Sequence, residues 1–233
     1  MKPVDKGQSL GLLQNYTDAK PHLIFRLGSQ CSYCEQFGYP QALHVEHIYP
    51  QDPHSELENE WDNLLLACST CNSYKNKHLG SKRQVNLESR YLWPHLDNTA
   101  NAFKYFDDGR IELSDNLPQD VKQAAENTID MVGALKSPTK AATFQDIGIA
   151  YDGMRKRKDM WEIASESRAE YLHANGGQSA ASLARRAAKM GFFSIWMTVF
   201  HDCREVRSEL IESFKADKTC FGPSTQPRPK GRI

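Results

Sequence analysis

The chain has 233 residues with 29 basic and 29 acidic side chains, so its formal net charge at pH 7 is zero. This balance argues against a protein that coats nucleic acid through bulk charge, and any affinity for nucleic acid must come from local patches or from a partner. Four of the six cysteines form two Cys-x-x-Cys pairs, which favours a reducing compartment over a disulfide-stabilised secreted domain.

Residues 1–30 form an N-terminal extension in this interpretation. Their opening, MKPVDKGQSL, lacks the apolar stretch of a secretory signal, and a helix is expected over Thr17–Arg26. The longest apolar run, Phe192–Phe200, is interrupted by Ser194 and Thr198 and is too short to span a bilayer. These features predict a cytoplasmic protein without a membrane partner.

The cysteine pairs enclose the most informative stretch of the chain, residues 31–78. Two residues between ligands allow one tight turn to offer both thiolates to a single ion, and two such pairs suit tetrahedral zinc. The sequence therefore predicts a structural zinc ion that fixes both ends of a closed loop. Its ligands are Cys31, Cys34, Cys68 and Cys71. Two disulfides, or four buried thiols, are the alternatives.

Between the pairs, the segment Leu43–Pro50 has the pattern of a short strand that ends at its proline. Alternation places Glu46 and His47 on opposite faces of a regular strand, so both can serve one site only if the strand ends or bulges there. Residues 61–71 then predict a turn, a second apolar strand and the second cysteine pair.

A helix is expected to begin directly after the second cysteine pair. Asn72 and Asn76 are four residues apart and would share one face of that helix, with Lys75 beside them. The stretch therefore combines strand, strand and helix with a histidine, a carboxylate and two amides, which are groups suited to a metal-assisted hydrolytic site.

This arrangement resembles the HNH endonucleases, the ββα-metal nucleases, in a zinc-stapled form; the motifs are Glu46-His47, Asn63-Leu64 and Cys71-Asn72 followed by Lys75. The resemblance implies that His47 is the general base that takes a proton from the attacking water. It implies that Glu46 and Asn72 are ligands of a catalytic divalent ion. It also implies that Asn63 ties down the loop that carries the base, with Asn76 as a further ligand and Lys75 as a phosphate contact.

Two residues depart from the commoner family pattern. Glu46 stands where Asp is more frequent, and Asn72 stands where the family usually has its last histidine. Both side chains offer oxygen donors, which favour magnesium or manganese over a second zinc ion at the active site.

Between the two predicted strands lies an acidic segment, residues 51–62, in which five carboxylates surround Trp61. Acidic side chains next to the base would repel phosphates. The segment is interpreted as a solvated loop, or alternatively as a docking surface for a basic partner or a gate over the site.

The remainder of the chain predicts a hairpin and then helices. The hairpin joins Phe103–Phe106 to Arg110–Leu113, and helices are expected over residues 118–132, 143–177 and 196–214. The second of these helices carries the basic run Arg155–Lys158, which fits a solvated helix face and a phosphate track equally well.

The predicted fold class is therefore α+β, with a zinc-stapled ββα-metal module followed by a mainly α-helical C-terminal region. The expected boundaries are residues 31–82 for the HNH module, 83–217 for the hairpin and helical domain, and 218–233 for a mobile basic tail.

The N-terminal HNH stretch is followed by YLWPHLDN, a hairpin and helices. This layout is similar to that of the PtuB nucleases of Septu and retron-associated antiphage systems. That resemblance implies an ATPase partner of the PtuA type and a nucleic-acid substrate, with DNA favoured and RNA, including tRNA, as the alternative. Two alternatives stay open: a zinc-ribbon module that binds nucleic acid or protein without cutting it, and a stand-alone restriction or homing-type HNH endonuclease.

Overall fold

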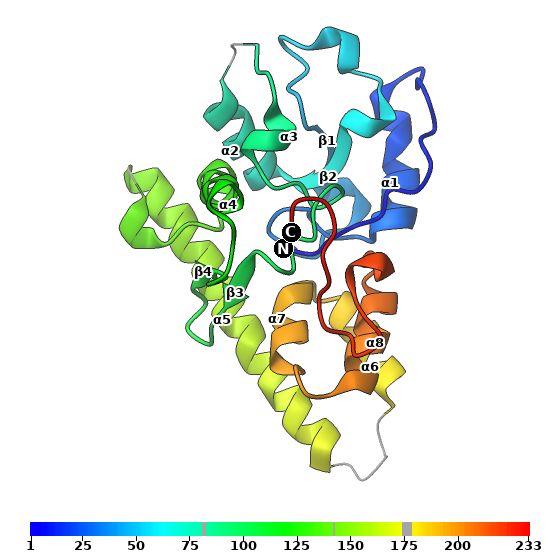
Figure 1. Ribbon diagram of the computed structural model, residues 1–233, viewed down its shortest axis with the longest axis vertical. Coiled ribbons are helices and arrows are strands. Elements are labelled where there is room, and N and C mark those ends of the chain that lie inside the picture. The colour runs from blue at the N-terminus through cyan, green and yellow to red at the C-terminus, as the bar shows by residue number, and fades with distance from the viewer. Residues whose placement is uncertain (81–82, 142, 174–178) are drawn as a thin grey trace.

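The computed structural model describes residues 1–80, 83–141, 143–173 and 179–233, and its fold is mixed α+β, as predicted. A small sheet and its helices form one part of the molecule, helices form the other, and the long helix α5 (Phe144–His173) runs beside both (Figure 1). The predicted module boundary at residue 82 and the predicted helix end at residues 176–177 lie outside the described residues.

The ββα unit forms where the sequence predicts it. Strand β1 (Leu43–His47) pairs in antiparallel fashion with β2 (Leu64–Cys68), with His47 opposite Leu64. Helices α1 (Ala19–Leu27) and α2 (Ser69–Leu79) both contact β2. Because β2 is covered on both sides, it is a continuous apolar run and not an alternating one.

The predicted hairpin is confirmed as strands β3 (Phe103–Tyr105) and β4 (Ile111–Leu113), which lie between the short helix α3 (Leu87–Arg90) and α4 (Gln119–Val132). Its turn packs closely against α5. Gly109 has φ +83°, and a Cβ there would lie 2.0 Å from the carbonyl oxygen of Met154 in α5. Only glycine satisfies both the backbone conformation and this close approach.

The C-terminal half contains α6 (Ala180–Ala188), α7 (Phe193–Val199) and α8 (Arg204–Ser213). The single helix expected over residues 196–214 is therefore wrong, because the chain turns between α7 and α8. Arg207 stabilises the turn, since its buried guanidinium donates a 2.8 Å hydrogen bond to the carbonyl oxygen of Met197. The buried apolar residues of α7 and α8, among them Trp196, Val206 and Leu210, belong to one hydrophobic cluster.

Two hydrophobic clusters result, one built around the ββα unit and α4 and the other around α6–α8. The terminal segment 218–233, which the sequence predicts to be mobile, is packed between them (Figure 1). Cys220 is fully buried in the second cluster, and the guanidinium of Arg232 pairs with Asp97 beside the first. The domain boundaries stay a prediction.

Within the described ranges, none of the helices combines the length and the apolar character that a membrane span requires.

Candidate active site and metal centre

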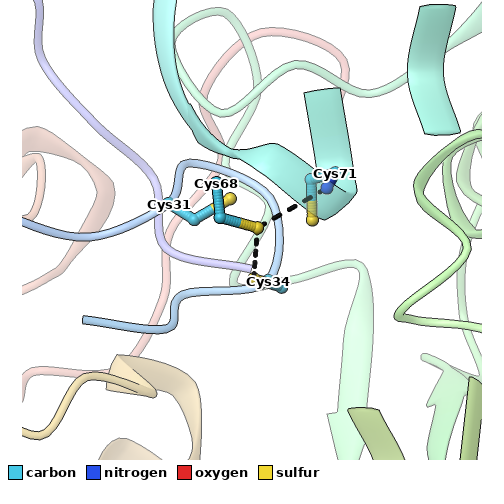
Figure 2. Close-up of side chains that lie close together, drawn as sticks. All are labelled: Cys31, Cys34, Cys68 and Cys71. Atoms are coloured by element: carbon cyan, nitrogen blue, oxygen red, sulfur yellow. Dashed lines mark hydrogen bonds between the residues drawn. The ribbon is translucent and has the colours of Figure 1, made fainter. Parts of the chain in front are cut away.

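The four predicted zinc ligands converge on one point. Cys31 and Cys34 lie in the turn before Phe37, Cys68 ends β2, and Cys71 lies in the first turn of α2 (Figure 2). Their sulfur atoms all lie within 4.8 Å of one another, and the sulfurs of Cys34 and Cys68 are 3.8 Å apart. Tetrahedral zinc with bonds of about 2.3 Å requires sulfur atoms about 3.8 Å apart. The cluster therefore has the donor set and the dimensions of a structural zinc site.

The alternative of two disulfides is excluded, because all six cysteines lie in the described part of the chain and each is a free thiol. Hydrogen bonds among the four sulfur atoms lower the pKa of Cys68 but raise the pKa of Cys34 and Cys71. A thiolate is the form that binds zinc, so the cluster offers one ready thiolate at Cys68, and the metal must displace protons from Cys34 and Cys71.

The first cysteine turn is also fixed to the helical half of the molecule. Glu35, in the left-handed conformation at φ +64°, is buried directly after Cys34. Its carboxylate accepts hydrogen bonds from the backbone N–H and the hydroxyl of Ser194 at 2.9 and 2.6 Å. The zinc site thus lies where the ββα unit meets α7.

His47, the last residue of β1, is held in a defined orientation. Its Nε2 lies 2.9 Å from the carbonyl oxygen of Glu58, and its ring meets the edge of Tyr16 with centroids 4.7 Å apart. A carbonyl oxygen can only accept, so Nε2 carries the proton in the neutral ring and Nδ1 keeps its lone pair. Burial lowers the pKa of His47 below its usual value, with the hydrogen bond to Glu58 acting in the opposite direction. The imidazole is therefore a neutral, oriented proton acceptor at neutral pH.

Asn63 fixes the loop that supplies this carbonyl. Its amide nitrogen donates to the carbonyl oxygens of Tyr49 and Leu57 at 3.2 and 3.0 Å, and its amide oxygen accepts from the backbone N–H of Tyr49 at 2.8 Å. One buried side chain thus joins the start of the loop after β1 to its far end, next to Glu58. The catalytic role of Asn63 stays a prediction.

The structure brings His47, Asn72 and Asn76 together around a pocket of about 510 Å³. The side chain of Asn76 donates to the amide oxygen of Asn72 at 3.1 Å, which orients both amides on the outer face of α2. Asp52 and His44 line the same pocket and were not predicted as site residues. Asp52 belongs to the acidic segment and lies only five residues after His47 in the sequence. This short separation is the signal that could have identified Asp52 as a site residue.

Glu46 and Lys75 lie outside the pocket of His47. Both side chains are fully buried and form an ion pair beneath β1, and the hydroxyl of Tyr33 donates a 2.5 Å hydrogen bond to the second oxygen of Glu46. Alternation along β1 places the side chain of Glu46 opposite that of His47, and Glu46 is not among the residues that line the pocket. In this arrangement the ammonium group of Lys75 has no access to a phosphate. It donates instead to the carbonyl oxygen of His47.

Residues 31–78 match the family model of the HNH endonucleases. The matched HNH segment begins at the first zinc ligand and ends in α2, so it includes the zinc cluster, both strands and the pocket amides. No curated protein matches the chain. The match supports a nuclease that acts on nucleic acid, and it leaves the hairpin and the helices from α4 onward without an assigned role.

The buried pair inside the HNH segment gives a stability prediction. Lys75→Met leaves the carboxylate of Glu46 buried without its counter-ion, which is expected to cost about 3–5 kcal/mol in the free energy of unfolding. The double variant Glu46→Gln, Lys75→Met removes both charges and should recover most of that loss, since glutamine still accepts from Tyr33. Urea unfolding of the three proteins measures this, and a double variant less stable than Lys75→Met would contradict the pairing.

Proposed function

We propose that this protein is a metal-dependent endonuclease that hydrolyses phosphodiester bonds of nucleic acid, with His47 as the general base. The observation that carries the proposal is the imidazole of His47, held by the carbonyl of Glu58 at a pocket lined by the amides of Asn72 and Asn76. The HNH family match over residues 31–78 supports it.

Hydrolysis requires a water whose proton is removed as it attacks the phosphorus, and the Nδ1 lone pair of His47 is available to take that proton. A divalent ion, magnesium or manganese, would neutralise the charge that grows on the phosphate when it is bound. The amide oxygens of Asn72 and Asn76 and the carboxylate of Asp52 would hold such an ion, with water and phosphate completing its shell. In this scheme Glu46 acts through Lys75, which holds the end of β1, and not as a direct ligand.

Cleavage assays on supercoiled plasmid and on total tRNA test the proposal, each with magnesium, with manganese and without an added divalent ion. The His47→Ala protein of equal zinc content is the blank for contaminating nucleases. Metal-dependent cleavage above this blank supports an endonuclease and identifies DNA or RNA as its substrate. Binding of zinc and nucleic acid without cleavage in any condition would instead favour a non-catalytic zinc-ribbon module.

We further propose that the enzyme is the nuclease of an antiphage system, acts in the cytoplasm and is controlled by an ATPase partner. The layout of the chain resembles the PtuB nucleases, and a zero net charge suits a nuclease that a partner delivers to its substrate. Assays with and without an ATPase encoded beside it separate this role from that of a stand-alone restriction or homing-type enzyme. Site-specific cutting by the isolated chain would favour the stand-alone enzyme.

The lowered pKa of His47 predicts the pH dependence of cleavage. Only the neutral imidazole can act as a base, so activity falls as pH decreases through the pKa of His47. Because burial lowers that pKa from its usual value of 6.5, the acid limb of the kcat/KM profile should have its midpoint below pH 6.5. A bound cation would shift the midpoint in the same direction. A midpoint above pH 6.5 would contradict the assignment.

A further inference from the structure

A second and larger hollow, about 920 Å³ in volume, lies between α1, the loop through Phe37–Pro40, α6 and the end of α8. Its floor is apolar and includes Ile24, Phe25 and Phe37. Its rim carries five basic side chains: Lys20, Arg185, Arg186, Lys189 and Lys215. Among the described residues that line this groove, none is acidic.

The five basic side chains of the groove lack carboxylate partners within the described chain; Lys215 contacts the carbonyl oxygen and the ring of Phe25. The basic run of α5 behaves differently. Three of its members form ion pairs with acids on their own helix, namely Arg155, Lys156 and Lys158. The fourth, Arg157, is buried and donates to the carbonyl oxygens of Gly109 and Ala134, both at 2.7 Å. Of these two basic sets, the groove and not α5 therefore offers accessible cations that lack carboxylate partners in the described chain.

The groove and the pocket of His47 are neighbours along two segments of the chain. Tyr16 lines the pocket and Lys20 lines the groove, one turn further along. In the same way, His44 lines the pocket and Pro40 lines the groove. A chain lying in the groove could thus continue over the start of α1 toward His47.

We propose that this groove binds single-stranded nucleic acid and leads it to the pocket of His47. The inference rests on the proposed nuclease function. Its rim cations match the phosphates of a polyanion. Its floor offers the ring of Phe25, which is 76% exposed and able to stack on a base. A duplex hides its base faces, and an acidic protein segment has no bases to stack, so the exposed ring favours a single strand.

Fluorescence anisotropy with labelled dT20 and rU20 tests this over a series of salt concentrations. The full-length His47→Ala protein is used with its zinc content confirmed and without added magnesium or manganese, so binding is measured whether or not the protein is a nuclease. Each phosphate contact to a single strand contributes about −0.7 to the slope of log K against log salt. Removing three cations in Arg185→Ala, Arg186→Ala, Lys189→Ala should make that slope shallower by about 2.

The matched control is Arg155→Ala, Lys156→Ala, Lys158→Ala, which removes the same formal charge from α5 and should leave the slope close to that of the parent protein. Phe25→Leu, a change at an exposed position, should weaken binding roughly tenfold through loss of stacking. Comparison of dT20 with rU20 shows whether the groove prefers DNA or RNA.

Three results would overturn the inference. The first is an equal change in slope for the two triple variants, and the second is unchanged affinity in Phe25→Leu. The third is displacement of the oligonucleotide by polyglutamate of matched charge as readily as by unlabelled oligonucleotide, which would make the groove a site for acidic protein. If cleavage is lost in His47→Ala while the two triple variants change the slope equally, the nuclease function stands and the groove is rejected.

Discussion

Replacing Cys71 by serine is expected to abolish zinc binding and to unfold the ββα unit. Cys71 is fully buried and its sulfur is one of four within 4.8 Å of one another, so its loss leaves three ligands and an open position. In zinc-finger peptides the metal contributes roughly 10–16 kcal/mol to folding. That contribution is as large as the whole net stability of a typical domain, about 5–15 kcal/mol. Elemental analysis and thermal unfolding followed by circular dichroism measure both effects.

Cys203→Ser is the matched control for the zinc prediction. Cys203 is half-buried, lies outside the cluster and hydrogen-bonds to Asp202, so its replacement should leave one zinc ion per chain and a similar melting temperature. If Cys71→Ser retained stoichiometric zinc and melted with the parent protein, the structural zinc assignment would be wrong.

The second large effect is expected from His47→Ala, which should reduce the rate of cleavage by about 10²–10⁴-fold, the usual contribution of a general base. The fold should survive this change. The loop that contacts His47 through Glu58 keeps its three hydrogen bonds to Asn63, and the zinc ligands are untouched. Single-turnover cleavage with saturating protein separates the chemical step from binding.

His201→Ala is the control for this variant, because His201 is exposed in the turn after α7 and does not line the pocket. Zinc content and oligonucleotide affinity should be equal in the parent and in both variants. Cleavage by His47→Ala at the parental rate, at the same zinc content, would remove His47 from the mechanism.

Local patterns were sufficient to predict the features that depend on neighbours in sequence. Cys-x-x-Cys spacing identified the four cysteines that converge in the structure, and apolar runs specified β1, β2 and the hairpin, because these elements are determined by periods of two to four residues. The position of Glu46 followed from the same alternation, which already placed it on the face opposite His47. The resemblance to HNH enzymes favoured a shared site, whereas the structure follows the alternation and pairs Glu46 with Lys75.

The features that sequence could not predict depend on contacts between distant segments. The groove forms only when α1 faces α6, about 160 residues further along the chain, and no local pattern distinguishes Arg185 from the basic run of α5. Net charge also concealed it, since charges that cancel over the whole chain are still segregated on its surface. The packed tail is a similar case, because the partners of Arg232 include Asp97 and the carbonyl oxygen of Ser89.

Helix α5 contacts both hydrophobic clusters, since Ile149 packs against the first and Met160 belongs to the second. At 1.5 Å per residue its 30 residues extend about 45 Å without interruption. The terminal segment joins the clusters a second time. Because α5 and the terminal segment contact both clusters, we expect the two clusters to unfold together. Hydrogen exchange should therefore show that the backbone amides of α7, α8 and β2 lose their protection at the same denaturant concentration.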